Sequence, residues 1–149
     1  MNENSLQAKL QGAWRLTDYF AESQNGSVFY PLGPDASGFI MYTHDAHMSA
    51  TIMHPNRPAF ESTDMMGATP NEQATAAAGY LSYAGTFVVD EANTVVTHQI
   101  KIALVPNWIG NEFKRKVILA GSKLELRALA PSLVAGEMRL VRVIWGRVR

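Results

Sequence analysis

The sequence predicts an all-β protein, a closed up-and-down antiparallel barrel of about eight strands with one helix between the third and fourth strands. Short alternating segments separated by turn residues follow one another along the 149-residue chain, with no repeat and no linker. The first strand opens on Gly12-Ala13-Trp14-Arg15-Leu16, and the last closes on Trp145-Gly146-Arg147. If these strands pair antiparallel, Arg147 lies beside Trp14 and covers its indole face. Such closure removes unpaired edges, so we expect one barrel domain over residues 1–149.

Composition narrows the class of protein. Hydrophobic residues make up 47% of the chain and charged residues 17%, which indicates a folded core. Thirteen Lys and Arg balance thirteen Asp and Glu without a strongly basic face, so no nucleic-acid partner is expected. The lack of cysteine excludes disulfides and thiolate chemistry. Polar first residues and the lack of a long apolar run predict a cytoplasmic protein with no membrane partner. The apolar, arginine-bearing last strand permits a homodimer.

Strand and turn signals place the first third of the chain. Asn25-Gly26 is a turn that tolerates positive φ, and the two prolines at 31 and 34 exclude an inner strand there. The expected elements are a short turn over 6–10, strands over 12–22, 37–42 and 47–53, and an extended crossing loop over 28–34.

A helix is predicted after an irregular loop over 54–67. Thr69 is a capping residue, Pro70 takes the first helical position, and Glu72 stands three residues after the cap. The alanine-rich run continues this helix to Tyr83, and Gly85 ends it. Further strands are expected over 86–89, 94–105, 112–119, 123–129 and 138–148.

An ordered set of short motifs runs along the chain. Its members are Tyr30-Pro31-Leu32-Gly33-Pro34, Gly38-Phe39-Ile40-Met41-Tyr42-Thr43, Met48-Ser49-Ala50, Pro55-Asn56-Arg57-Pro58, Gly79-Tyr80-Leu81-Ser82-Tyr83-Ala84-Gly85-Thr86, Pro106-Asn107-Trp108-Ile109-Gly110 and Trp145-Gly146-Arg147. With Gly12-Ala13-Trp14, which resembles the Gly-x-Trp opening of the lipocalins, this set resembles the small bacterial and fungal lipocalin-like domain family over about residues 10–148. The resemblance implies a calyx-shaped ligand cavity, in a family often found as stand-alone cytoplasmic domains without assigned chemistry.

Two strands carry polar residues among apolar ones. One face of the strand over 94–105 presents Val96, His98, Ile100, Ile102 and Leu104, and one face of the next strand presents Phe113, Arg115, Val117 and Leu119. If the apolar faces point inward, His98 and Arg115 enter the cavity. A buried charge is costly unless it is paired, so these residues indicate either a ligand site or structural groups bonded to tyrosine hydroxyls and buried water. Both interpretations stay open.

Asp18 is a third candidate for the interior. It shares a face of the first strand with Trp14, Leu16 and Phe20, if that strand alternates without interruption. On that face it would pair with Arg115 or orient His98, giving a carboxylate and imidazole that transfer protons near neutral pH. A bulge after Leu16 would instead turn Asp18 to solvent.

A second group of residues supplies flat apolar walls with polar tips, the mixture expected around a small aromatic or polyketide-like ligand. Its members are Tyr42, Met48, Tyr80, Tyr83, Asn107 and Trp108. Tyr80 and Tyr83 stand three residues apart on the expected helix and would therefore face the same way. The alternative is a lid packed on the barrel mouth without ligand contact.

Two functions are consistent with these observations. In the first, the barrel is a cofactor-independent isomerase or cyclase of specialised, polyketide- or terpenoid-like metabolism. It acts on a hydrophobic, oxygenated substrate with His98, Arg115 and Asp18 as catalytic groups. In the second, it is a non-catalytic binder or carrier of such a small molecule. No metal site or cofactor is expected, because His44 and His47 have no third ligand nearby and no phosphate loop or dinucleotide fingerprint occurs.

Overall fold

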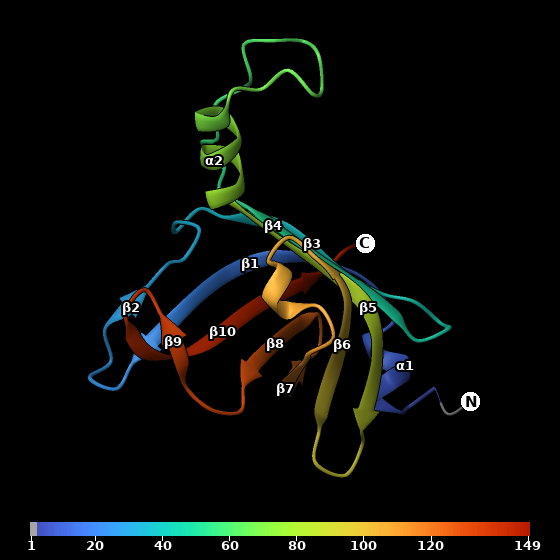
Figure 1. Cartoon of the computed structure of the whole chain (residues 1–149). Coiled ribbons are helices and arrows are strands. Elements are labelled where there is room, and N and C mark those ends of the chain that lie inside the picture. Colours follow the sequence, from blue (N-terminus) through green and yellow to red (C-terminus); the bar gives the residue numbers. More distant parts are fainter. Residues whose placement is uncertain (1–2) are drawn as a thin grey trace.

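The chain forms a closed antiparallel barrel in a computed structural model that describes residues 3–149 (Figure 1). Within these residues the barrel strands are β1 (Gly12–Ser23), β3 (Ser37–Tyr42), β4 (His47–Met53), β5 (Tyr80–Asp90), β6 (Val95–Ala103), β7 (Glu112–Ala120), β8 (Lys123–Ala128) and β10 (Glu137–Arg147). Each strand pairs with the next in this order, and β10 closes the barrel against β1. Two short strands, β2 (Val28–Phe29) and β9 (Ser132–Val134), pair with the ends of β1 and β10. The predicted fold class is confirmed.

Helix α1 (Leu6–Leu10) covers one end of the barrel. Leu10 and Trp14 are fully buried, and the indole Nε1 of Trp14 donates to the carbonyl of Leu10 at 2.9 Å. Arg147 is the register partner of Trp14, and its guanidinium lies 3.8 Å from the centre of the indole ring. The same guanidinium donates to the carbonyls of Lys9 and Gln11. The predicted contact between Trp14 and Arg147 is therefore confirmed, and it fastens α1 to the barrel.

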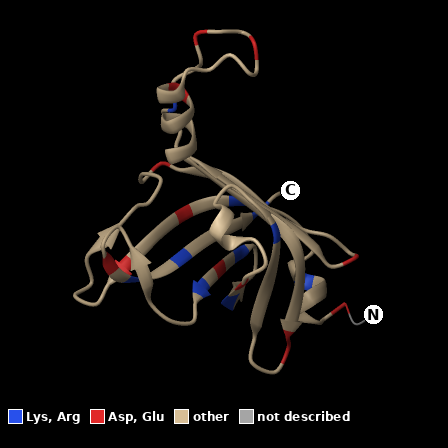
Figure 2. Cartoon of the chain, viewed as in Figure 1, with Lys and Arg blue, Asp and Glu red and all other residues tan. Residues whose placement is uncertain are grey.

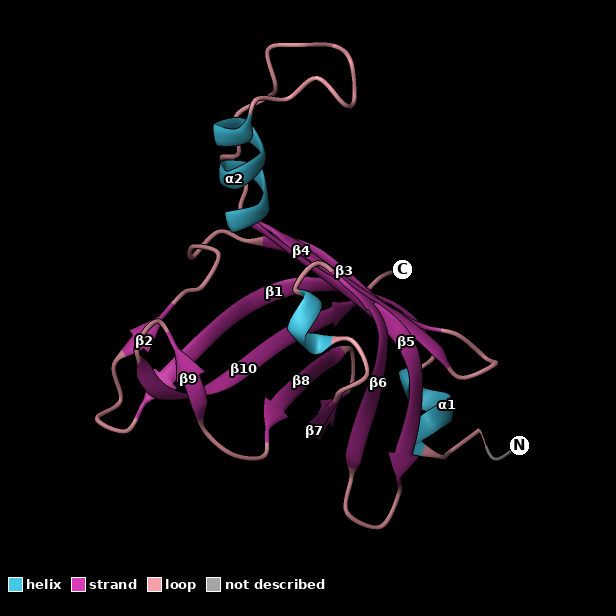
Figure 3. Ribbon diagram, viewed as in Figure 1, coloured by secondary structure: helices cyan, strands magenta, loops and turns pink. Residues whose placement is uncertain are grey.

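The opposite end of the barrel carries the longer connections. They include the segment 30–36, the loop 54–69 with helix α2 (Pro70–Ala78), the 3-10 turn η1 (Pro106–Trp108), and β9. Helix α2 and its loop project away from the barrel wall (Figure 3), and no residue of α2 is buried. No helix within residues 3–149 is long and apolar enough to span a bilayer.

The structure corrects the predicted end of helix α2. Its start is as expected, because Thr69 and Glu72 form a reciprocal capping box. The helix ends at Ala78, however, and β5 begins at Tyr80. Strand β5 pairs with β4 along its first half, and this ladder outweighs the helical propensity of the preceding alanines. Tyr80 and Tyr83 therefore lie on a strand and face opposite sides of the barrel wall.

A bulge in β6 changes which of its residues face inward. Gly85 pairs with Ile100 and Ala84 with Ile102, so Lys101 is an extra residue without a partner in β5. Before the bulge, Val96, His98 and Ile100 are buried. After it the side chains swap faces, and Ile102 is 69% exposed. The expectation that Ile102 and Leu104 face the interior is wrong for this reason.

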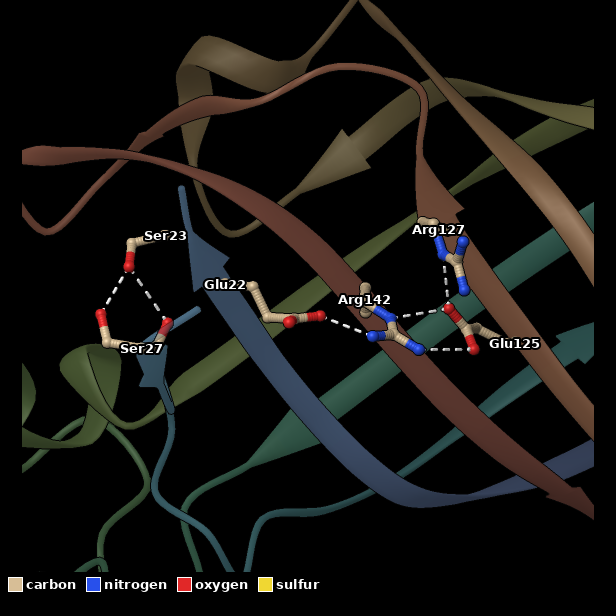
Figure 4. A network of polar contacts seen from close by, with 6 residues as sticks. All are labelled: Glu22, Ser23, Ser27, Glu125, Arg127 and Arg142. Atoms are coloured by element: carbon tan, nitrogen blue, oxygen red, sulfur yellow. Dashed lines mark hydrogen bonds and ion pairs between the residues drawn. The ribbon is translucent and has the colours of Figure 1, made fainter. Parts of the chain in front are cut away.

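Charged residues are sparse along the strands of the barrel (Figure 2). Figure 4 shows Arg142 of β10 between two carboxylates. Its Nη1 donates to Glu22 at 2.5 Å, and its Nε and Nη2 donate to Glu125 at 2.8 and 3.1 Å. Arg127 donates to Glu125 at 2.8 Å. The cluster links β1, β10 and β8 across the closure of the barrel.

We expect Glu125→Gln to lower the free energy of unfolding by about 2 kcal/mol at pH 7, because Arg142 loses a bidentate carboxylate. Hydrogen bonds from Arg142 and Arg127 hold the pKa of Glu125 below its usual range. The stabilisation is therefore present above the unfolded-state pKa of about 4.3 and is lost as the pH falls through the folded-state value. Urea unfolding at pH 7 and pH 3 checks this result, with Glu137→Gln at an exposed ion pair as the control. If Glu125→Gln lowered the free energy of unfolding equally at pH 7 and pH 3, the stabilisation would not come from the ionised carboxylate.

Candidate ligand cavity

A cavity of about 410 Å³ occupies the barrel interior and reaches the end that carries the long connections. Its walls are mainly aliphatic, with Ile40, Ile52, Leu81, Leu126, Val141 and Val143 among the lining residues. Pro31, Trp108 and β9 border it on the side of the mouth. The polar lining consists mainly of Tyr19, Tyr83, His98 and Arg115. An apolar hollow of this volume with a few convergent polar groups is typical of a small-molecule site.

His98 lies inside the barrel as predicted and is fully buried. Its Nε2 is 2.7 Å from the hydroxyl of Tyr42 on β3, and its Nδ1 is 2.9 Å from the hydroxyl of Tyr83 on β5. Burial lowers the pKa of His98 to about 3, and the positive charge of Arg115 acts in the same direction. The imidazole is therefore neutral at pH 7 with both ring nitrogens engaged. This makes it a poor base toward a molecule in the cavity.

The proton order along these three side chains follows from hydrogen-bond accounting. A neutral imidazole has one N–H donor and one acceptor nitrogen, so one tyrosine donates to the ring and the other accepts from it. Tyr42 is 2% exposed, and its hydroxyl has no second partner among residues 3–149. If Tyr42 accepted from His98, its own buried proton would lack an acceptor, which is costly. The favoured order is Tyr42 donating to Nε2 and Nδ1–H donating to Tyr83, which leaves the Tyr83 proton available to the cavity.

Arg115 also faces the interior, as its strand pattern predicted. It pairs with Val96 of β6 and Ala128 of β8, both buried, and it lines the cavity. Its guanidinium lies 4.8 Å from the ring centre of Phe113, and its Nη1 donates to the carbonyl of Lys114. Within the described chain, Arg115 forms no ion pair with a carboxylate. It is thus a half-buried cation at the cavity wall.

Asp18 does not join His98 and Arg115. The register of β1 against β10 shifts between Leu16 and Asp18, so Thr17 is an extra residue. After this bulge Tyr19 lines the cavity, while Asp18 pairs with Ile144 on the outer wall. The expectation of an inward Asp18 is wrong, and the bulge after Leu16 is the alternative that the structure adopts. Phe20 moves to the outer wall with Asp18, where the guanidinium of Arg142 covers its ring at 5.1 Å.

Two of the predicted ligand-contacting residues line the cavity, namely Tyr83 and Trp108. Tyr42 and Met48 are buried register partners in the core and do not border the cavity. Tyr42 reaches it only through its hydrogen bond to His98.

Tyr80 and Asn107 also lie away from the cavity wall. The Tyr80 ring is covered by the guanidinium of Arg57 at 5.1 Å. Asn107 is exposed in η1, where its carbonyl accepts a hydrogen bond from the side chain of Asn111 at 2.8 Å. Both residues contribute to the structure around the mouth.

Three further aromatic residues line the cavity without being among the predicted ligand contacts, namely Tyr19, Phe113 and Trp145. Phe113 packs edge to face with Tyr83 and Trp108, at centroid distances of 5.3 and 5.1 Å, so the three rings form one wall near the mouth. The alternating pattern of the strand that carries Arg115 already indicated that Phe113 faces the interior. Tyr19 was missed because its orientation depends on the bulge at Thr17. Trp145 borders the cavity as well, and its buried Nε1 has no hydrogen-bond partner among the described residues.

Comparison with known proteins places the chain in a family. The model of a lipocalin-like domain family matches residues 11–148. The chain is also similar to the 4'-hydroxy-3'-methoxypropiophenone carrier protein of Aspergillus oryzae, with 34% identity over 107 residues. This alignment covers 68% of this chain and 96% of that protein. The family match agrees with the closed eight-stranded barrel of the structure. The chain belongs to the lipocalin-like domain family.

Proposed function

We propose that this protein is a carrier that binds a hydrophobic, oxygenated small molecule of specialised metabolism in the barrel cavity and releases it unchanged. The observation that carries the proposal is the cavity of about 410 Å³, apolar over most of its wall, with the Tyr83 hydroxyl and the Arg115 guanidinium facing it. Apolar walls supply affinity, and a few fixed polar groups select and orient the ligand.

The ligand named for the relative has chemistry that these walls could accommodate. The Aspergillus oryzae protein is described as a carrier of 4'-hydroxy-3'-methoxypropiophenone. That compound combines an aromatic ring with a ketone and an acidic hydroxyl. Phe113 and Trp108 offer aromatic faces to such a ring, and Tyr83 and Arg115 offer donors to its oxygens. A compound of this class is therefore our first probe for this chain.

We expect 4'-hydroxy-3'-methoxypropiophenone to bind saturably, as measured by calorimetry, and to be recovered with its mass unchanged. Val143→Trp should weaken this binding about tenfold or more, because an indole at Val143 fills part of the cavity. Ile118→Trp on the outer wall is the matched control and should bind like the original protein, since Ile118 is 38% exposed. Unaltered affinity in a folded Val143→Trp variant would place the ligand elsewhere.

An isomerase or cyclase is the second candidate function. The observation that favours it is that Tyr83 and Arg115 face the same cavity, where together they could polarise a carbonyl. Mass spectrometry and chromatography of the recovered ligand separate the two functions. A rearranged product formed in proportion to protein concentration would favour the enzyme over the carrier.

A further inference from the structure

The charge of the cavity wall differs from that of the outer wall. Three partly buried arginines elsewhere, Arg127, Arg139 and Arg142, each form an ion pair with a glutamate. Arg115 forms none within residues 3–149, and no Asp or Glu is among the residues that line the cavity. The cavity wall thus carries one permanent positive charge without a protein counter-charge.

The other titratable groups that face this cation are neutral at pH 7. They are Tyr19 on β1, Tyr42 on β3, Tyr83 on β5 and His98 on β6. Burial raises the pKa of Tyr83 to about 12, although the charge of Arg115 opposes this change. Tyr83 therefore remains a hydrogen-bond donor, and none of these side chains neutralises Arg115.

Arg115 is half-buried as a residue, and its guanidinium meets a backbone carbonyl and an aromatic ring but no carboxylate among the described residues. A cation at the wall of an apolar cavity is unfavourable when no opposite charge compensates it. A bound oxyanion compensates it directly, since charge-assisted hydrogen bonds from arginine are roughly twice as strong as neutral ones. The Tyr83 proton, left free by the order of hydrogen bonds from Tyr42 through His98, supplies a second donor for an anionic oxygen.

We propose that the cavity binds its ligand as an anion, an acidic phenol or enol conjugated to a carbonyl, with Arg115 as the counter-charge and Tyr83 as a hydrogen-bond donor. This inference rests on the proposed function, because it requires a ligand in the cavity. It adds the charge state of the ligand and the residue that selects it. Neutral ligands of the same shape bind more weakly.

The probe 4'-hydroxy-3'-methoxypropiophenone tests the proposal, because loss of its phenolic proton shifts its ultraviolet absorption to longer wavelength. The absorbance of the probe is titrated with pH, free and with saturating protein. We expect the apparent pKa of the bound probe to fall by about one unit or more, as for an acid near an opposite charge. The 4'-O-methyl ether of the probe cannot ionise and should bind about tenfold more weakly above the pKa of the bound phenol.

Arg115→Met should abolish the pKa shift of the bound probe and bring its affinity close to that of the ether. Arg115→Lys retains the charge and should restore part of the shift. Lys114→Met removes a neighbouring cation on the outer face of β7 and is the matched control, with the shift unchanged. Thermal unfolding of each variant confirms that it is folded.

The outcomes separate this inference from the proposed function. If the probe and its ether bind the original protein equally well and the bound phenol shows no pKa shift, the protein binds small molecules but the anion proposal is wrong. If a shift persists in folded Arg115→Met, another group selects the anion and the assignment to Arg115 is wrong. If neither compound binds, the proposed function fails for this ligand class and the inference fails with it.

Discussion

Trp14→Ala is expected to lower the free energy of unfolding by about 4 kcal/mol, as for a large aromatic side chain removed from a packed core. Trp14 is fully buried and belongs to the main apolar cluster of the barrel. Its indole ring also supports the guanidinium of Arg147, and its Nε1 donates to the carbonyl of Leu10. The substitution therefore removes core volume and loosens α1 from the closed end of the barrel.

Urea unfolding followed by far-ultraviolet circular dichroism measures this loss, and two variants apportion it. Trp14→Phe keeps an apolar ring but loses the hydrogen bond to Leu10, so it should cost less than half as much. Trp108→Ala removes a half-buried indole at the open end and should cost less than Trp14→Ala. Similar losses for Trp14→Ala and Trp108→Ala would contradict the larger contribution expected from the fully buried indole at the α1 end of the barrel.

Gly85→Ala should lower the free energy of unfolding by about 3 kcal/mol, because β5 and β6 approach closely at the bulge opposite Lys101. A Cβ atom built on Gly85 would lie 1.9 Å from the backbone carbonyl oxygen of Gln99. Neither atom belongs to a flexible side chain, so the ladder itself must shift to relieve the clash. The bulge that orients His98 relative to Tyr83 would then be disturbed.

Gly146→Ala is the matched control for this substitution. Gly146 is also a strand glycine, and a Cβ atom there would meet the side chain of Thr17 at 3.7 Å, an ordinary contact. Chemical denaturation should show little change for this variant. If the two alanine substitutions proved equally costly, close approach of the backbones would not be the reason for glycine at position 85.

Several parts of the structure could be predicted because their causes are local. The strands over 37–42 and 47–53 have the bounds that were expected, since alternation and the turn at 43–46 are written in adjacent residues. The start of α2 was predicted from Thr69 and Glu72 for the same reason. His98 and Arg115 were placed inside by the pattern of their own strands.

Other parts depend on partners distant in sequence. Residues 80–83 follow a run of alanines with high helical propensity. Pairing with β4 nevertheless makes these residues part of a strand. The tyrosines that hold His98 come from β3 and β5, which the sequence alone does not bring together. The structural alternative for His98, with hydrogen bonds to tyrosines, is the arrangement found. Arg115 has no hydrogen bond to a tyrosine among residues 3–149.

The sequence by itself determined the closed barrel, the pairing of its first and last strands through Trp14 and Arg147, and the two strands whose inward faces carry His98 and Arg115. Only the tertiary structure decided which residue of β1 enters the cavity and how far the inward face of β6 extends. The reason is that side chains alternate with a period of two. The extra residues Thr17 and Lys101 therefore reverse every orientation that follows them, turning Asp18 outward and Tyr19 inward.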